Sequence, residues 1–162
     1  MFRLNWLLVL FWILIAVQPS FADDRGKILG IWRLVSYEVE SQATREREPV
    51  VGKNPTGYIL FTPEGRMMVV NTGEGRKPAS TDQDRAELFK SLVAYTGMYR
   101  VEGDKWITKV DVAANPAWVG TEQTRFLRVE GDRLQESTPV MQWAARPEKG
   151  KVRFILTYEQ AK

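Results

Sequence analysis

Three tight turns, each set between runs of apolar and β-branched residues, constrain the fold of this chain most strongly. Gly65 lies in the turn PEGR, Gly103 in EGDK and Gly131 in EGDR. In the first of them, proline fixes the backbone angle φ and glycine supplies the open corner. Turns of this kind join neighbouring antiparallel strands, so the sequence predicts a hairpin at each point.

The segments around these turns have the composition of β-strands. A long strand is expected over 30–40, and further strands are expected at GYILFT, RMMVVN, on both sides of EGDK and EGDR, and at KVRFILTYE. Several strands at a spacing of about eight to twelve residues indicate an antiparallel barrel or sandwich. No linker, repeat or low-complexity segment interrupts them, which predicts one mainly-β domain over residues 27–160.

One segment has helical rather than strand periodicity. In STDQDRAELFKSLVAY the apolar residues fall at positions 88, 89, 92 and 93, which is the spacing of one helical face. Ser80 followed by Gln83 suits a capping box, and acidic residues occupy the first turn. The pattern predicts a single mid-chain α-helix over about 81–94.

The N-terminus has the layout of a secretory signal peptide. Arg3 gives a positive start, 6–17 is an unbroken apolar run, and Ser20 and Ala22 are small residues before a cleavage site. The run is shorter than the roughly 20 residues that a membrane-spanning helix needs. Cleavage after Ala22 therefore makes 1–22 a signal peptide, and no stable membrane span is expected afterwards. A retained leader acting as an anchor is the alternative.

The chain has no cysteine and no histidine. An exported domain without disulfides is more typical of a bacterial periplasm than of a small eukaryotic secreted protein, so a periplasmic location is expected, with secretion as the alternative. Without these two residue types, no Ser-His-Asp or Cys-His nucleophile system is possible, and no His-ligated metal site. No phosphate-binding glycine loop and no calcium-loop spacing occur. No metal, no cofactor and no catalytic residue is assigned.

The charge pattern argues against a nucleic-acid partner. The formal net charge of +3 comes from 23 basic and 20 acidic residues. The basic residues are interleaved with acids rather than clustered, whereas nucleic-acid binding needs a basic face. Scattered examples are Arg45, Arg47, Lys53, Arg85, Arg133 and Lys149.

Four runs in order resemble a known family. LGIWRLVSY contains a Gly-x-Trp signature at Gly30 and Trp32, and PTGYILFTPEGRMMV, AYTGMYRVEGD and NPAWVGTEQTRFLRVEGDRL follow it. Together they resemble the bacterial and fungal lipocalin-like domain family over roughly residues 29–158. The resemblance implies an antiparallel up-and-down β-barrel of about eight strands, related to lipocalins and fatty-acid-binding proteins. Relatives commonly carry histidine in the strand WITKVDV, where this chain has Thr108 and Lys109.

A polar strand supplies the main candidate site. Barrel strands alternate between the lumen and the outside. Along GTEQTRFLRVE, the face with Gln123 and Arg125 becomes apolar further on at Leu127 and Val129, so it is expected to face the interior. A buried arginine must be paired. Its partner is either a protein group, such as a carbonyl, a tyrosine, Glu38 or the ring of Trp32, or the carboxylate or carbonyl of a ligand.

The aromatic residues leave a similar choice between core packing and ligand binding. Tyr58 and Tyr99 are the preferred polar handles in the lumen, Met68 is expected to supply an adaptable wall, and Trp118 is expected to close the rim or to cap the core. With Arg125 and Gln123, these residues make up the predicted lumenal site.

The sequence therefore predicts an exported protein that holds a small apolar or amphipathic molecule inside a barrel, of the fatty acid, isoprenoid or aromatic acid class. Two alternatives remain open. One is a small isomerase or cyclase that uses the same pocket, for which the sequence offers thin support. The other is a structural or inhibitory module whose barrel is filled by its own side chains. The oligomeric state does not follow from the sequence.

Overall fold

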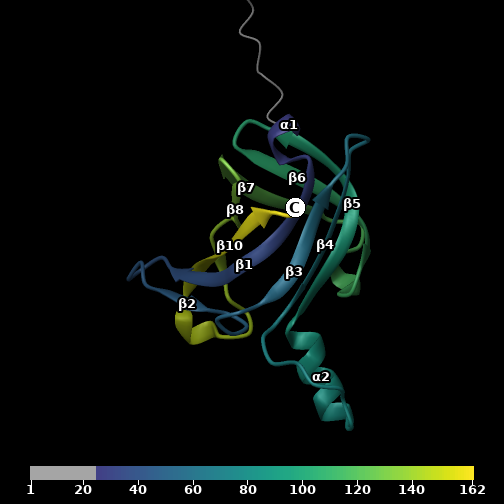
Figure 1. The fold of residues 1–162 in the computed structure, drawn as a ribbon. Helices are drawn as coiled ribbons and strands as arrows, with labels where there is room; N and C mark the ends of the chain where they lie inside the picture. The colour runs from purple at the N-terminus through teal and green to yellow at the C-terminus, as the bar shows by residue number, and fades with distance from the viewer. Residues whose placement is uncertain (1–24) are drawn as a thin grey trace, which may run out of the picture.

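The computed structural model describes residues 25–162 as a β-barrel with few helices (Figure 1). The predicted leader, 1–22, lies outside the described residues. The elements in chain order are α1 (Arg25–Ile28), β1 (Gly30–Ser41), β2 (Arg47–Pro49), β3 (Thr56–Phe61), β4 (Arg66–Thr72), α2 (Asp82–Lys90), β5 (Leu92–Glu102), β6 (Lys105–Ala113), η1 (Pro116–Trp118), β7 (Glu122–Glu130), β8 (Arg133–Ser137), β9 (Met141–Gln142), η2 (Pro147–Lys149) and β10 (Lys151–Gln160).

Strand pairing closes the sheet on itself. Strands β1, β3, β4, β5, β6, β7, β8 and β10 follow one another as antiparallel neighbours, and β1 pairs with β10 to complete an eight-stranded barrel. The short strands β2 and β9 extend this wall beside β1 and β10. The expected single antiparallel up-and-down barrel is therefore confirmed, and so are the turns at PEGR, EGDK and EGDR.

The two ends of the barrel differ in their connections. At one end, here called the closed end, α1 lies beside the three tight turns (Figure 1). The other end, here called the open end, carries the long connections 42–55, 73–91, 114–121 and 138–150. Short turns leave no chain to form a cavity, so any hollow is expected among the long connections.

Aromatic side chains fill the closed end. Trp32 is buried, and its Nε1 donates a hydrogen bond to the carbonyl of Ile28 at 2.8 Å, which fastens α1 across the barrel. The ring of Phe61 packs edge-on against Tyr99 at 5.1 Å and against Trp106 at 5.0 Å. Each large apolar side chain buried in this way contributes about 2 kcal/mol. Gly30 lies two residues before Trp32. The backbone there has a φ of 109°, which glycine adopts without strain and other residues rarely adopt.

A β-bulge in β1 changes which residues face the interior. The register with β10 shifts between Leu34 and Ser36. Before the bulge Leu34 faces inward, and after it Tyr37 and Val39 face inward while Glu40 faces outward. The extra residue at the bulge explains why the sequence of this strand alternates only loosely.

The helix is shorter than predicted. It covers Asp82–Lys90 rather than 81–94, because Leu92 and Val93 pair with β4 as the first residues of β5. The capping box is formed by Thr81 and Asp84, not by Ser80 and Gln83. None of its residues is buried, and α2 extends beyond the open end (Figure 1).

Candidate functional site

Polar side chains occupy inward positions in the middle of the barrel. Alternation along each strand continues from the packed closed end, so the next inward position on several strands is polar or a tyrosine. We call this set the polar layer; it consists of Tyr37 on β1, Asn71 on β4, Tyr95 on β5, Arg125 on β7, Glu136 on β8 and Tyr158 on β10.

A short chain of hydrogen bonds runs through the polar layer. The Asn71 Nδ2 donates to the Tyr158 hydroxyl at 2.8 Å, and that hydroxyl donates to Glu136 Oε1 at 3.1 Å. Arg125 Nε lies 3.8 Å from Glu136 Oε2, which is an ion pair but too long for a hydrogen bond. Arg125 also donates from Nη1 to the carbonyl of Thr124 at 2.9 Å. One arginine and one carboxylate are thus held together inside the barrel.

Burial sets the protonation of this layer. Burial raises the pKa of Glu136 above its usual range, and this outweighs the attraction of Arg125 and the hydrogen bond from Tyr158. Burial likewise raises the pKa of Tyr37 to about 12, so its hydroxyl is neutral at physiological pH. Burial opposes the charge on Arg125, but the tyrosines and Glu136 around it raise its pKa, and it stays cationic.

Several polar atoms near this layer have no hydrogen-bond partner within residues 25–162. They include Asn71 Oδ1, Glu136 Oε2, Thr108 Oγ1 and Trp106 Nε1, all of them buried. A buried polar atom without a partner costs about 1–3 kcal/mol. Such groups mark positions where water or the polar atoms of a ligand would form hydrogen bonds.

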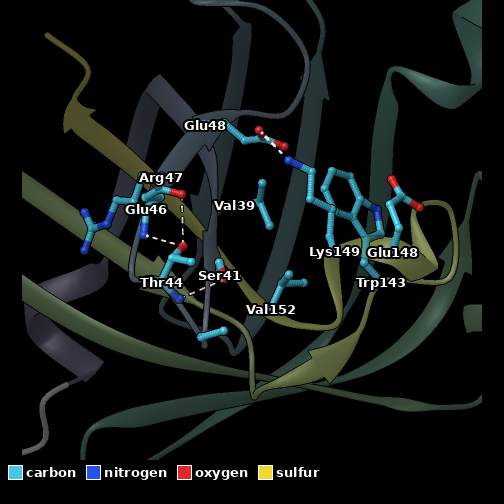
Figure 2. A pocket seen from close by; sticks show the side chains of 11 residues that line it. Val39, Ser41, Thr44, Glu46, Arg47, Glu48, Trp143, Glu148, Lys149 and Val152 are labelled. Carbon is cyan, nitrogen blue, oxygen red and sulfur yellow. Dashed lines mark hydrogen bonds and ion pairs between the residues drawn. The ribbon is translucent and has the colours of Figure 1, made fainter.

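A hollow of ≈ 610 Å³ lies at the open end (Figure 2). Its apolar walls include Val39, Val152 and the indole of Trp143. The rest of its lining comes from the connections beside β1 and β10, and we call it the mouth pocket; the lining residues are Val39, Ser41, Ala43, Thr44, Glu46, Arg47, Glu48, Trp143, Glu148, Lys149 and Val152.

An ion pair ties the two sides of the mouth pocket together. Glu48 on β2 binds Lys149 on η2 at 2.9 Å, as Figure 2 shows, and Arg146 at 3.3 Å. The hydrogen bond from Lys149 also lowers the pKa of Glu48. All three side chains are partly exposed, so this link is weak and can open.

Aromatic rings connect the mouth pocket with the polar layer. Trp143 packs edge-on against Phe154 at 5.4 Å, and Phe154 packs edge-on against Tyr37 at 5.9 Å. Phe154 is therefore the ring between the pocket and the polar layer, next to Val39 in the strand register.

The predicted inward pair on β7 lies inside the barrel. Arg125 joins the polar layer, and Gln123 follows on the same face nearer the open end, where its amide donates to Thr121 Oγ1 at 3.0 Å. The partners of Arg125 are Glu136 and, as one of the expected acceptors, a backbone carbonyl, that of Thr124; Glu38 and Trp32, which the sequence also suggested, are not its partners. Among the described residues, the cation over a closed-end ring is Arg25, at 5.3 Å from the ring of Tyr99.

The aromatic candidates have different outcomes. Tyr99 is in the interior but belongs to the closed-end core, where its hydroxyl donates to the carbonyl of Thr62 at 3.1 Å. Trp118 on η1 packs edge-on against Tyr95 at 5.7 Å, so it covers the polar layer from the open end.

The lumenal placement of Tyr58 and Met68 was wrong. Tyr58 is 53% exposed and Met68 is 48% exposed, because their buried neighbours Ile59, Met67 and Val69 hold the inward positions. Both strands are apolar on both faces, so their sequence does not reveal which face is inside.

Sequence reasoning missed Glu136, the most deeply buried charged partner in the site. A signal existed, because the hairpin around EGDR places Glu136 opposite the inward residue Leu127, diagonally from Arg125. Tyr158 could be found in the same way, since it pairs with the buried Leu134. The loop residues of the mouth pocket carry no comparable signal.

A closed barrel with one packed end and one hollow end defines, at the level of its class, a barrel that binds small molecules. The chain belongs to the lipocalin-like domain family, whose pattern matches residues 29–161. A search of curated proteins finds no match. Within residues 25–162, no helix has the length and apolar character to cross a membrane, and no group of three or more acidic residues gathers as metal ligands would.

Proposed function

We propose that this protein is an exported binding protein that holds a small amphipathic molecule, of the fatty acid, isoprenoid or aromatic acid class, at the open end of its barrel. The mouth pocket is the observation that carries this proposal. Its ≈ 610 Å³ lies within the range of ligand sites, and it combines apolar walls with a charged rim. The leader-like sequence of residues 1–22 supports export to the periplasm.

The geometry suggests how such a ligand would be oriented. Its apolar part would contact Val39, Val152 and Trp143. Arg125 retains guanidinium donors beyond its bond to Thr124, and a carboxylate would pair with it. Phe154 lies between the pocket and the polar layer, so a head group reaches Arg125 only when this ring moves aside.

Native mass spectrometry of the protein purified from the cell's own periplasm tests the proposal directly, since a retained ligand adds its mass. Titration with palmitate, farnesol and 4-hydroxycinnamate, followed by tryptophan fluorescence, then identifies the class. Trp143→Ala is expected to weaken binding about tenfold by removing a large contact surface. The control is Phe126→Ala, which removes an exposed aromatic ring from the outer wall. No adduct and no response to any probe would contradict the proposal.

A second comparison tests the orientation. Palmitate and hexadecanol share a chain and differ in the carboxylate. Replacing both Arg125 and Glu136 by neutral residues, as Arg125→Met with Glu136→Gln, is expected to weaken palmitate binding and to leave hexadecanol unchanged, because only the acid pairs with the guanidinium. Equal weakening of both ligands would show that the head group stays in the mouth pocket.

A small isomerase or cyclase is the second candidate, and the state of Glu136 favours it. A carboxyl whose pKa is raised by burial, next to the Tyr158 hydroxyl, can supply a proton to a bound substrate. The test is NMR of a bound ligand incubated with the protein. Conversion that stops in Glu136→Gln, while binding persists, supports catalysis, whereas an unchanged ligand contradicts it.

The third hypothesis, a structural or inhibitory module whose barrel is filled by its own side chains, describes only the closed end. There the aromatic core leaves Trp32, Phe61 and Trp106 fully packed. The hollow at the open end speaks for ligand binding instead.

A further inference from the structure

The outer wall of the barrel has an unusually apolar side. Six large apolar side chains on β1, β3, β4, β5 and β6 are between 48% and 63% exposed. Together they present on the order of 600 Å², which is the upper end for the largest apolar patch on a monomer. We call this surface the apolar outer face; its residues are Ile31, Tyr58, Met68, Val70, Met98 and Val112.

Strand register makes this face continuous. One row crosses five strands, from Ile31 to Leu60, Met68, Thr96 and Val112, each residue paired with the next. A hollow of ≈ 190 Å³ with a mainly apolar lining interrupts the row beside Met68 and Val112. The surface is therefore one patch with a recess for a side chain, not a scatter of exposed residues.

The opposite outer wall has the composition expected of a solvated surface. On β7 and β8 the outward positions include Arg128, Glu130 and Arg133, Arg128 pairs with Glu130, and Phe126 is the large apolar side chain exposed on these two strands. Both walls are outward faces of the same barrel, so polar side chains could occupy either of them without burial. The difference between them indicates that the apolar outer face is covered by something.

The structure restricts what can cover it. Strands β3, β4 and β5 are paired on both sides, so no free edge can accept a peptide as an added strand. The basic residues in and beside the face are already paired with acids: Arg66, which lies next to Met98 in the strand register, pairs with Asp111 at 2.9 Å, and Arg33 pairs with Glu159 at 3.1 Å. A rim of balanced charge offers no attraction to an anionic membrane surface.

A second copy of the chain fits these observations. A two-fold contact brings the same patch to itself, so it needs a self-complementary apolar surface with neighbouring charges of both signs. About 600 Å² of apolar area, enlarged by its rim, approaches the roughly 800 Å² per partner of a stable complex. The recess near Met68 can accept a side chain of the facing copy.

We infer that the protein forms a two-fold homodimer through the apolar outer face. The mouth pocket shares no residue with this face, so both copies keep an accessible pocket. The inference is independent of what the pocket binds.

Sedimentation velocity of the protein, purified after expression of the complete chain, tests the inference. A dimer is expected at about 100 μM, well above the dissociation constant of a working homodimer. Val112→Glu places a charge in the apolar outer face of each copy and is expected to raise the dissociation constant at least tenfold. Val140→Glu is the matched control, because Val140 is 50% exposed but lies in a connection away from the face, and it should leave the dimer intact.

Circular dichroism confirms that each variant is folded, and Met68→Gln, which keeps the side-chain length, replaces Val112→Glu if that variant fails to fold. A wild-type protein that stays monomeric at this concentration overturns the inference. So does a dimer that persists in both variants. A monomer that binds vesicles of anionic phospholipid would assign the face to a lipid surface and also overturn it.

Discussion

Two glutamates of this barrel are equally buried, at 4% exposure, yet their surroundings are opposite. Glu40 lies on the outer wall and accepts hydrogen bonds from Arg45 at 3.3 Å, Arg47 at 3.0 Å and Arg153 at 2.9 Å. Glu136 lies inside, where one arginine approaches to 3.8 Å and one tyrosine donates a bond.

The pKa values of the two carboxyls follow from this difference. Burial favours the protonated form of both, but the hydrogen bonds and charges of three arginines lower the pKa of Glu40, while burial dominates and raises the pKa of Glu136. A carboxylate with several arginine partners, such as Glu40, stabilises the outer wall of the barrel. An underpartnered charge of the second kind is what a binding or reaction site contains.

The largest expected effect comes from removing Arg125, the one cation that pairs with Glu136 within residues 25–162. Arg125→Met should cost about 3 kcal/mol of unfolding free energy at pH 8, because it leaves a buried carboxylate without a partner. At pH 5 the loss should be smaller, since Glu136 takes up a proton. Urea unfolding at both pH values measures this. Arg100→Met, which removes an exposed arginine from the outer wall, is the control, and an equal loss at both pH values for Arg125→Met would contradict the prediction.

The next effect concerns the hydroxyl between Asn71 and Glu136. Tyr158→Phe should cost about 2 kcal/mol, because it leaves Asn71 Nδ2 and Glu136 Oε1 without partners inside the barrel. Thermal unfolding followed by circular dichroism measures the loss. Tyr58→Phe makes the same chemical change on the exposed outer face and should leave the melting temperature unaltered.

On the outer wall, Glu40→Gln should cost about 1 kcal/mol at pH 7, since the three arginines that face the carboxylate are themselves partly exposed. Because folding lowers the pKa of Glu40, its contribution is present above the ordinary value of 4.5 and disappears as the pH falls through the lowered pKa. Unfolding measured from pH 7 to pH 3 should therefore bring variant and wild type together. A constant difference over this range would exclude the charge as its cause. Glu148→Gln, an exposed acid, is the control.

The smallest effect is expected for Glu136→Gln, whose stability relative to wild type changes with pH in the opposite direction to that of Glu40→Gln. Folding raises the pKa of Glu136, so its contribution is complete below the ordinary value of 4.5 and is lost as the pH rises through the raised pKa. Relative to wild type, Glu136→Gln should therefore gain stability between pH 4 and pH 8, by less than the Glu40→Gln difference at pH 7. The same unfolding series measures it, and a relative loss with rising pH would reverse the assignment.

The barrel itself was predictable because its signals are local. Glycine turns and strand composition are read over a few residues, and both reappear in the structure at the expected positions. The inward direction of Arg125 was predictable for a related reason, since β7 is apolar on only one face near Leu127 and Val129.

The rest of the site depends on relations that a single strand does not contain. Tyr58 and Met68 were misplaced because the apolar outer face makes both sides of β3 and β4 look alike. Glu136 required the register across a hairpin, and the bulge in β1 reversed the direction of Tyr37. The mouth pocket is made largely by irregular connections, whose shape follows from packing rather than from periodicity.

The bulge in β1 divides one strand between two tasks. Residues before it, such as Trp32, belong to the packed closed end. Of the residues after it, Tyr37 belongs to the polar layer and Val39 lines the mouth pocket. Val35 is the residue without a partner on β10, so deleting it would remove the bulge and leave Tyr37 and Val39 facing inward. A relative without the bulge therefore aligns with a gap of one residue at Val35, whereas a deletion elsewhere between Trp32 and Tyr37 would turn one part of the strand inside out.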